Sequence, residues 1–232
     1  SATEKVRAAD GAAAEGAAPA GGDAPPRFTC DFEERPDGTF IWHASLVLLR
    51  YLQAPERARQ LRGRRVLELG SGLGHLGHGL ARLGAHVTCT EQAKCLPDLR
   101  SSLEEQDRAE GPADAAGGSL RSIELSWGEE GFDASALGVE MAGPDAQPFD
   151  FVISAELVYL EETHDLLLYT WQRLCSPQTQ IYSVFINRPF SWNFFAKLHD
   201  LDHFEVAQLD EERDFDPCGL EECHMHVVTL KG

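Results

Sequence analysis

A chain of 232 residues with 43% hydrophobic residues can bury the core of one domain, and no second domain is needed. Its 20 basic and 38 acidic residues give a net charge of −18, which argues against nucleic acid and anionic membrane surfaces and favours a basic protein partner. The six cysteines are scattered without a C-x-x-C pair, which is typical of reduced thiols, so we expect a protein of the cytoplasm or also the nucleus.

The first 26 residues are rich in Ala, Gly and Pro, and Val6 is their one large apolar side chain. Burial cannot offset the entropy of ordering such a segment, so residues 1–26 are predicted to be a disordered, low-complexity tail before a single domain over 27–232. Acidic residues among the alanines do not fit a secretory or mitochondrial leader. No stretch is long and apolar enough to cross a membrane.

The domain is predicted to begin with a β-hairpin and helix. Apolar residues alternate over 28–32, residues 35–38 have turn chemistry, and a second strand leads to Trp42. Leu and Val over residues 44–52 predict a helix with an apolar face, and Pro55 begins a second short helical piece. Trp42 is either a core side chain or part of a site.

Residues 66–77, Val-Leu-Glu-Leu-Gly-Ser-Gly-Leu-Gly-His-Leu-Gly, predict a buried strand, a glycine loop and the start of a helix. Glycines permit positive φ and a close approach of a ligand, while the free N–H groups of the next helix point at polar ligand atoms. The stretch 72–77 also reads G-x-G-x-x-G, with Glu91 about 20 residues further on, so it nominally satisfies a dinucleotide site. A bare strand-to-helix turn is the alternative.

Two acidic residues near this loop, Glu68 and Glu91, indicate which ligand it could bind. Glu68 is expected to place its carboxylate next to the loop, where it would repel a pyrophosphate and attract the sulfonium and ammonium groups of S-adenosylmethionine. Glu91 closes a strand over residues 85–90, and an acid at that position hydrogen-bonds ribose hydroxyls in both kinds of site. Glu91 could otherwise be a solvated loop charge.

The rest of the chain alternates between strands and helices and predicts a doubly wound α/β sheet that ends in an antiparallel hairpin. The strand over 149–154 is apolar enough for the centre of the sheet and delivers Glu156 and Tyr159 to its carboxyl edge, where ligands bind. The expected strands are 122–127, 149–154, 180–186, 204–209 and 224–230; the helices are 75–83, 93–107, 162–174 and 191–200; surface loops are 108–118 and 129–147.

Several of these features together resemble the class I, seven-strand protein methyltransferases of the methyltransferase-like 21 type. They are Trp42 before a Leu-rich helix, the strand and loop of residues 66–74, Glu91, Leu-Ser-Trp-Gly at 125–128, and Glu-Leu-Val-Tyr at 156–159. The similarity covers about residues 28–230. It implies a Rossmann-like sheet with an N-terminal extension and a protein methyltransferase acting on lysine, in a group whose substrates include chaperones, elongation factors and a AAA ATPase.

The resemblance also implies site residues. Together with Glu68, the S-adenosylmethionine site would be formed by Trp42, Gly70, Ser71, Gly72, Gly74, Glu91, Trp127 and Ala155. Glu156 and Tyr159 would be the catalytic residues at the mouth where methyl transfer occurs. The commoner family form has Asp where Glu156 stands, and Ile186 replaces an acid in an aromatic-acid-x-Arg segment over 185–188.

Competing functions remain at this point. An NAD-type Rossmann oxidoreductase is disfavoured by Glu68 and by the lack of room for a substrate domain, and a catalytically silent binding protein of the same fold is the third possibility. A metal site is weighed at the residues Cys218, Cys223, His224 and His226. These histidines alternate with apolar residues as in a terminal strand, so we expect no metal. We expect a monomer that acts on a basic or lysine-presenting protein surface, with no nucleic acid or membrane partner.

Overall fold

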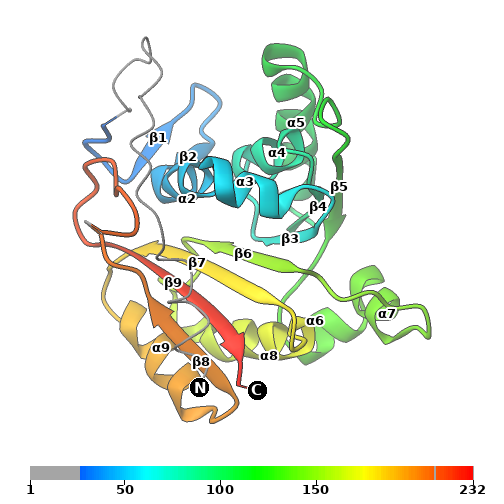
Figure 1. Ribbon diagram of the computed structural model, residues 1–232, viewed down its shortest axis with the longest axis vertical. Coiled ribbons are helices and arrows are strands. Elements are labelled where there is room, and N and C mark those ends of the chain that lie inside the picture. The colour runs from blue at the N-terminus through cyan, green and yellow to red at the C-terminus, as the bar shows by residue number, and fades with distance from the viewer. Residues whose placement is uncertain (1–26, 212, 232) are drawn as a thin grey trace.

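The computed structural model describes residues 27–211 and 213–231, so the predicted tail over 1–26 lies outside the described residues. A seven-stranded sheet in the order β5-β4-β3-β6-β7-β9-β8 forms the centre, with a separate two-stranded hairpin, β1-β2 (Figure 1). The strands are β1 (Phe32–Glu34), β2 (Phe40–Trp42), β3 (Arg65–Leu69), β4 (His86–Glu91), β5 (Ser119–Glu124), β6 (Phe151–Ala155), β7 (Gln180–Ile186), β8 (Phe204–Gln208) and β9 (Cys223–Leu230).

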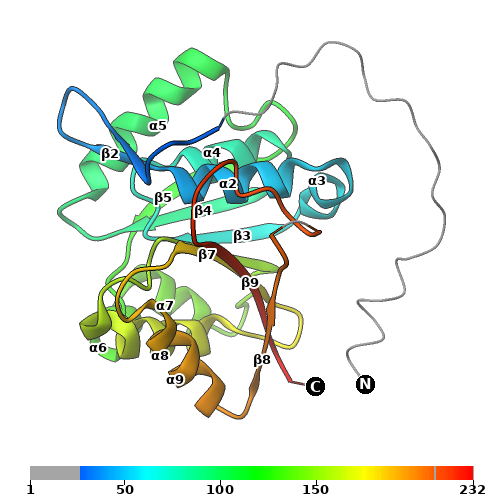
Figure 2. The same cartoon turned by 90° about the vertical axis from the view of Figure 1, so that its left-hand side faces the viewer.

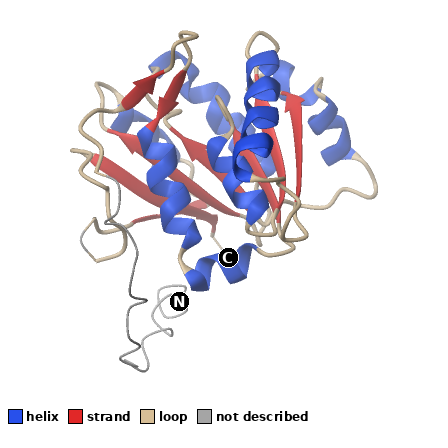
Figure 3. Cartoon of the chain, turned by 90° about the horizontal axis from the view of Figure 1, so that it is seen from above, coloured by secondary structure: helices blue, strands red, loops and turns tan. Residues whose placement is uncertain are grey.

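Helices cover both faces of this sheet. They are α2 (His43–Gln53), α3 (Pro55–Leu61), α4 (His75–Arg82), α5 (Leu96–Glu110), α6 (Glu129–Asp133), α7 (Ala136–Ala142), α8 (His164–Leu174) and α9 (Ser191–Asp200), with a 3-10 turn η1 (Glu161–Thr163) before α8. The helices α2 to α5 lie on one face and α6 to α9 on the other (Figure 2). Seen from above, helices lie over the strands of the sheet (Figure 3). The predicted doubly wound α/β architecture is confirmed.

The core follows from the alternation of side chains along the central strands. Val66 of β3 belongs to a buried cluster with residues of α2 and α4, such as Leu48 and Leu80. The next residue, Leu67, belongs to a second cluster with residues of α8, such as Trp171. One sheet therefore separates two apolar layers, and β3, whose side chains are buried on both faces, is an interior strand of it.

The order of the strands places the site. From β3 the chain runs through β4 to β5 on one side and then returns to β6 on the other, and all these strands are parallel. Leu69 of β3 pairs with Ser154 of β6, so the segments that follow them begin side by side. In open α/β sheets ligands bind in the crevice at such a reversal of strand order, at the carboxyl ends of the strands.

The carboxyl-terminal hairpin is confirmed, since β8 and β9 pair antiparallel and β9 also pairs antiparallel with β7. The predicted strand over 122–127 lies earlier, at β5, because its pairing with β4 runs from Ser119 opposite His86 to Glu124 opposite Glu91. Trp127 therefore follows the strand instead of ending it. The predicted insertion over 129–147 contains the short helices α6 and α7, and the helix expected over 93–107 is α5, which begins at Leu96 beside a proline.

No helix in the described part of the chain has both the length and the apolar character that a membrane span requires.

Candidate active site

The glycine loop joins β3 to α4, and its glycines have different reasons to lack a side chain. Gly70, Gly72 and Gly74 all have positive φ, at 56°, 55° and 76°. A Cβ on Gly70 would lie 2.7 Å from Leu157, and one on Gly74 would lie 2.7 Å from Leu99. A Cβ on Gly72 would meet nothing within 4 Å. The loop is therefore packed on the protein at its two ends and open at Gly72, where a ligand can approach the backbone.

Ser71 fastens this loop to the end of β4. Its N–H donates to the Thr90 carbonyl at 2.9 Å, and its hydroxyl accepts from the Thr90 N–H at 3.1 Å. The Thr90 hydroxyl in turn donates to the Glu68 carbonyl at 2.8 Å. The side chain of Ser71 thus holds the loop in shape, and its backbone is part of the open edge.

Glu91 lies where the sequence predicts, at the end of β4 and against the glycine loop. One carboxylate oxygen accepts from the Gly72 N–H at 3.1 Å, and the other accepts from the Gln92 N–H at 2.8 Å. The carboxylate is half-buried beside the open glycine, and each of its oxygens has a further lone pair for a hydroxyl donor.

Glu68 does not lie where the electrostatic argument expected it. Its carboxyl is only 3% exposed, accepts from the Cys89 thiol at 3.3 Å, and fills the space beside Gly77, where a Cβ would come within 2.6 Å of it. Burial raises the pKa of Glu68 to about 7, against hydrogen bonds from Cys89, Ser71 and the Gly77 N–H that lower it. The side chain packs against α4 in the space that the missing Cβ of Gly77 leaves open. The expected contact with a ligand cation is corrected accordingly.

Trp127 and Ala155 lie beside the first glycine of the loop. The Trp127 ring would be 3.5 Å from a Cβ on Gly70. Ala155 is the last residue of β6 and is half-buried, one position beyond the pairing of Ser154 with Leu69. Both residues therefore lie beside the glycine loop, at the carboxyl edge of the sheet.

Glu156 is the first residue after β6 and is held in an unusual backbone conformation. Its φ is 58°, a region that residues other than glycine seldom adopt, and its side chain is buried. The Glu156 N–H donates to the Val184 carbonyl at 2.9 Å, and its carboxylate accepts from the Ile186 N–H at 2.8 Å. Such strain persists only where the surroundings over-determine it, which is common at functional sites.

The second oxygen of Glu156 pairs with the guanidinium of Arg188. Burial raises the pKa of Glu156, while the charge and hydrogen bond of Arg188 lower it, and the balance stays on the raised side. Arg188 also reaches Asp31, with 3.3 Å between Nη2 and Oδ2. The site is thus a chain of acid, base and acid that connects the loop before β1 with the ends of β6 and β7.

Aromatic rings surround this ion pair. The rings of Trp42 and Tyr159 are stacked, with 6.5 Å between centroids and 25° between planes. The Arg188 Cζ lies 5.3 Å from the Trp42 centroid and 5.9 Å from that of Tyr159. Phe32 lies 5.3 Å from Trp42 at the outer side of the hairpin. Trp42 is half-buried, so it is not in the core interior, and its place in the cofactor site stays a prediction.

Sequence reasoning missed two members of this constellation. Arg188 stands in the segment 185–188, whose likeness to an aromatic-acid-x-Arg pattern was the available signal. Asp31 has no such signal, because it lies 157 positions from Arg188 and only the fold brings them together. Ile186, which replaces the acid of that pattern, packs its side chain in the core and serves Glu156 through its backbone N–H.

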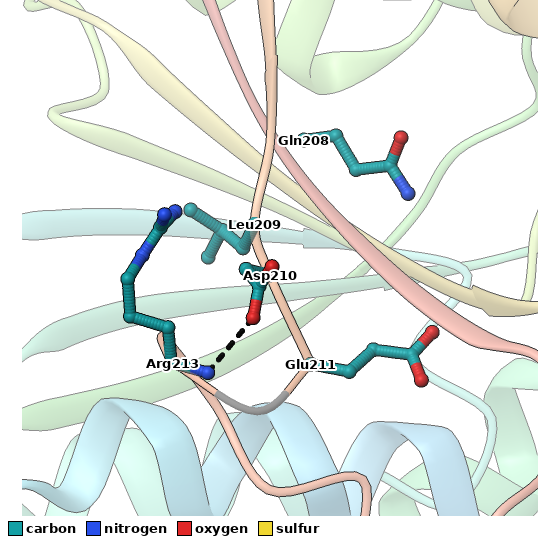
Figure 4. A pocket seen from close by; sticks show the side chains of 5 residues that line it. All are labelled: Gln208, Leu209, Asp210, Glu211 and Arg213. Carbon is teal, nitrogen blue, oxygen red and sulfur yellow. Dashed lines mark hydrogen bonds between the residues drawn. The ribbon is translucent and has the colours of Figure 1, made fainter.

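A separate surface pocket follows β8 and is lined by none of the predicted site residues (Figure 4). Its lining residues are Gln208, Leu209, Asp210, Glu211 and Arg213, and the Arg213 N–H donates to Asp210 at 2.9 Å. Within residues 27–211 and 213–231, no three His, Cys, Asp or Glu side chains are grouped so that they could hold a metal ion. The weighed site at Cys218, Cys223, His224 and His226 has no support in this geometry.

Comparison with known proteins decides between the candidate families. A family model described as "Lysine methyltransferase" matches residues 31–201. The chain belongs to this lysine methyltransferase family. The predicted family is therefore confirmed, and the matched range covers the hairpin, the glycine loop and the acid that follows β6. The oxidoreductase alternative is not favoured.

Relatives of this chain support its assignment to the lysine methyltransferase family. "Protein N-lysine methyltransferase METTL21A" of Danio rerio is 31% identical over 189 residues, which cover 81% of this chain and 79% of the relative. "EEF1A lysine methyltransferase 3" of Mus musculus is 33% identical over 175 residues, 74% of this chain and 67% of the relative. The protein of the same name in Xenopus tropicalis is 33% identical over 144 residues, and there the chain matches 54% of the relative's length.

Solved structures of other proteins have a fold similar to that of this chain. A ribosomal protein L11 methylase from Lactobacillus delbrueckii subsp. bulgaricus superposes with a TM-score of 0.53 at 15% identity, covering 85% of this chain and 83% of the other. A TehB-like SAM-dependent methyltransferase from Corynebacterium glutamicum gives a TM-score of 0.51 at 17% identity, covering 81% and 88%. At such identities the likeness concerns the fold, and it confirms the predicted Rossmann-like methyltransferase sheet.

Proposed function

We propose that this chain transfers a methyl group from S-adenosylmethionine to a lysine side chain of a protein. The observation that carries the proposal is the place of Glu156, a buried carboxylate paired with Arg188, whose guanidinium lies over the rings of Trp42 and Tyr159. Glu156 lies at the carboxyl end of β6, next to the glycine loop that follows β3. Membership of the lysine methyltransferase family supports the same reaction. A silent binding protein would have no need for a strained acid there.

The residues around the glycine loop fit the cofactor. The backbone of Gly72 is open to a ligand, and the Glu91 carboxylate beside it has lone pairs left for two ribose hydroxyls. Trp127 lies beside Gly70, and Ala155 ends the neighbouring strand β6. When bound, S-adenosylmethionine supplies a methyl group on a sulfonium, and what remains for the protein is to hold the acceptor amine in line and free of water.

On the acceptor side, a lysine with the ordinary pKa of about 10.4 is protonated at neutral pH and has no lone pair. Glu156 recruits this ammonium by charge and orients the amine, and the proton leaves to water or transiently to the carboxylate, whose pKa is raised by burial. Tyr159 and Trp42 supply aromatic faces that favour a cation and exclude water.

We further propose that the substrate is a protein with a basic surface around the target lysine. The named relatives are a protein N-lysine methyltransferase and an EEF1A lysine methyltransferase, and the net charge of −18 favours such a partner. A monomer in the cytoplasm or nucleus, with no nucleic acid partner, fits the acidic chain and its six free cysteines.

The test is methyl transfer from radiolabelled S-adenosylmethionine into a cell lysate, followed by hydrolysis and analysis of the labelled amino acids. We expect label in methylated lysine with the natural chain and much less with Glu156→Gln. Label in RNA or small metabolites would refute the proposal, and so would calorimetric binding of NAD in place of S-adenosylhomocysteine.

The proposed cofactor site predicts that Glu91 contributes to the affinity for S-adenosylhomocysteine. Glu91→Ala removes two charge-assisted hydrogen bonds to the ligand and the acceptor of the Gly72 N–H, so S-adenosylhomocysteine should bind more weakly by on the order of 2 to 4 kcal/mol in calorimetry. Glu124, its exposed neighbour on β5, is the matched control, and Glu124→Ala should bind as the natural chain does. Unchanged affinity in Glu91→Ala would remove Glu91 from the site.

A further inference from the structure

The acceptor site proposed above already contains a cation of the protein's own. The Arg188 guanidinium contacts the carboxylates of Glu156 and Asp31 and faces the rings of Trp42 and Tyr159. Two carboxylates and two aromatic faces are the surroundings that an alkyl ammonium also prefers. The side chain of Arg188 therefore stands where a substrate lysine would have to place its charge.

Both cations cannot use Glu156 together. Its side chain is 4% exposed, one oxygen accepts from the Ile186 N–H, and the other already pairs with the Arg188 guanidinium. Two positive groups about 4 Å apart repel each other, more strongly in a partly buried site than in water. A buried carboxylate without any cation is unfavourable as well. The site therefore favours one cation at a time.

Arg188 is the group that can leave. It lies in the short connection between β7 and α9, its side chain is 24% exposed, and its second contact, Asp31, is 47% exposed on the outer side. A rotation outward could keep the pair with Asp31 while it gives up Glu156. Glu156 itself is held by backbone hydrogen bonds with Val184 and Ile186 and stays in place.

We propose that Arg188 is a resident substitute for the substrate ammonium, which neutralises Glu156 in the resting protein and is displaced when the target lysine enters. The identity of the displacing group as lysine rests on the proposed function. A neutral acceptor side chain cannot replace the positive charge that Glu156 loses when Arg188 turns out, so the exchange selects for a cationic acceptor. It also lowers the apparent affinity for that acceptor, because only the fraction of molecules with Arg188 turned out can bind it.

The test uses n-butylammonium, the lysine side chain without its backbone, as the probe. Its affinity is measured by ligand-observed NMR on the full chain, with and without S-adenosylhomocysteine, for the natural protein, Arg188→Gln and Arg188→Ala. The glutamine retains a hydrogen-bond donor for Glu156 and guards against misfolding, which thermal unfolding checks. We expect both variants to bind the probe roughly tenfold or more tightly than the natural chain. Equal or weaker binding in both variants would overturn the proposal.

Two controls locate the effect. Arg64 forms an ion pair with Asp150 at 3.0 Å, just before β3, so Arg64→Gln removes a paired arginine outside the site and should leave the probe's affinity unchanged. Adding Glu156→Gln to Arg188→Gln should abolish the gain, and a gain that persists would show that the probe binds elsewhere. Failure of S-adenosylhomocysteine to bind the natural chain would refute the proposed function, while the titration without it still decides the role of Arg188.

Discussion

At the scale of single residues, Glu156 combines burial, a positive φ and two separate partners for its two oxygens. Glu156→Gln preserves its shape and removes its charge, so the ammonium is no longer recruited. Turnover should fall by roughly 10² or more, while S-adenosylhomocysteine binds within a few-fold of the natural affinity. Single-turnover methyl transfer and calorimetry measure the two quantities. Retained turnover would rule out the catalytic role, and parallel loss of both would make Glu156 a cofactor ligand.

Glu68 is the second acid whose environment predicts a measurable effect. Desolvation first, and the charge of Glu91 to a smaller extent, raise its pKa in the folded protein to about 7, from 4.5. The folded state therefore holds a proton that the unfolded state has released between these values, so this group's contribution to stability is full below about pH 4.5 and is lost as the pH rises to about 7.

Glu68→Gln replaces the carboxyl with a neutral group of the same shape and removes this loss. The variant should gain stability relative to the natural chain as the pH rises from 5 to 8, by on the order of 3 kcal/mol if the full shift is expressed. Urea unfolding across this pH range measures the difference. Glu130→Gln, at an exposed position on α6, is the control and should show no such trend. If the difference in the free energy of unfolding between Glu68→Gln and the natural chain did not change with pH, the raised pKa of Glu68 would be contradicted.

At the scale of elements, the loop between β3 and α4 allows the effect of backbone strain to be measured apart from the effect on ligand access. Gly72 and Gly63 both have positive φ, at 55° and 71°, and a Cβ on either meets nothing within 4 Å. Gly72→Ala and Gly63→Ala should therefore destabilise the protein similarly, by roughly 1 to 2 kcal/mol. The new methyl group should weaken S-adenosylhomocysteine binding only in Gly72→Ala. Thermal unfolding and calorimetry give both quantities, and equal binding by the two variants would place the cofactor elsewhere.

The strands and helices that sequence patterns predict well are those with strong local signals. The apolar run of β6 and the glycines after β3 specify a buried strand and a loop, and both are found. The predicted bounds of β5 are wrong because its pairing with β4, not its own apolar residues, determines where the strand begins and ends. The direction of the Glu68 side chain and the contact of Arg188 with Asp31 depend on packing between distant segments, which a local pattern does not contain.

At the scale of the whole molecule, the net charge of −18 acts on partners at a distance. Attraction between this surface and a basic substrate weakens as ions screen it, over about 10 Å at 0.1 M salt. Methyl transfer to a basic protein should therefore show a rising KM between 50 and 500 mM sodium chloride with little change in kcat, as steady-state kinetics would measure. A KM independent of salt would mean that the acidic surface serves solubility alone.

The tie between Arg188 and Asp31 has a consequence for the order in which the chain folds. It spans 157 positions, and the nearby bond from the Phe28 N–H to the Cys218 carbonyl, at 2.7 Å, closes an even longer loop. Closing such loops costs entropy that local contacts do not, so we expect these contacts to form late, after the chain has been synthesised through Arg188 and Cys218. We therefore expect a nascent chain with a finished glycine loop still to lack the contacts around Glu156. Under the proposed function, such a chain would gain the ability to bind a partner's lysine only with complete folding.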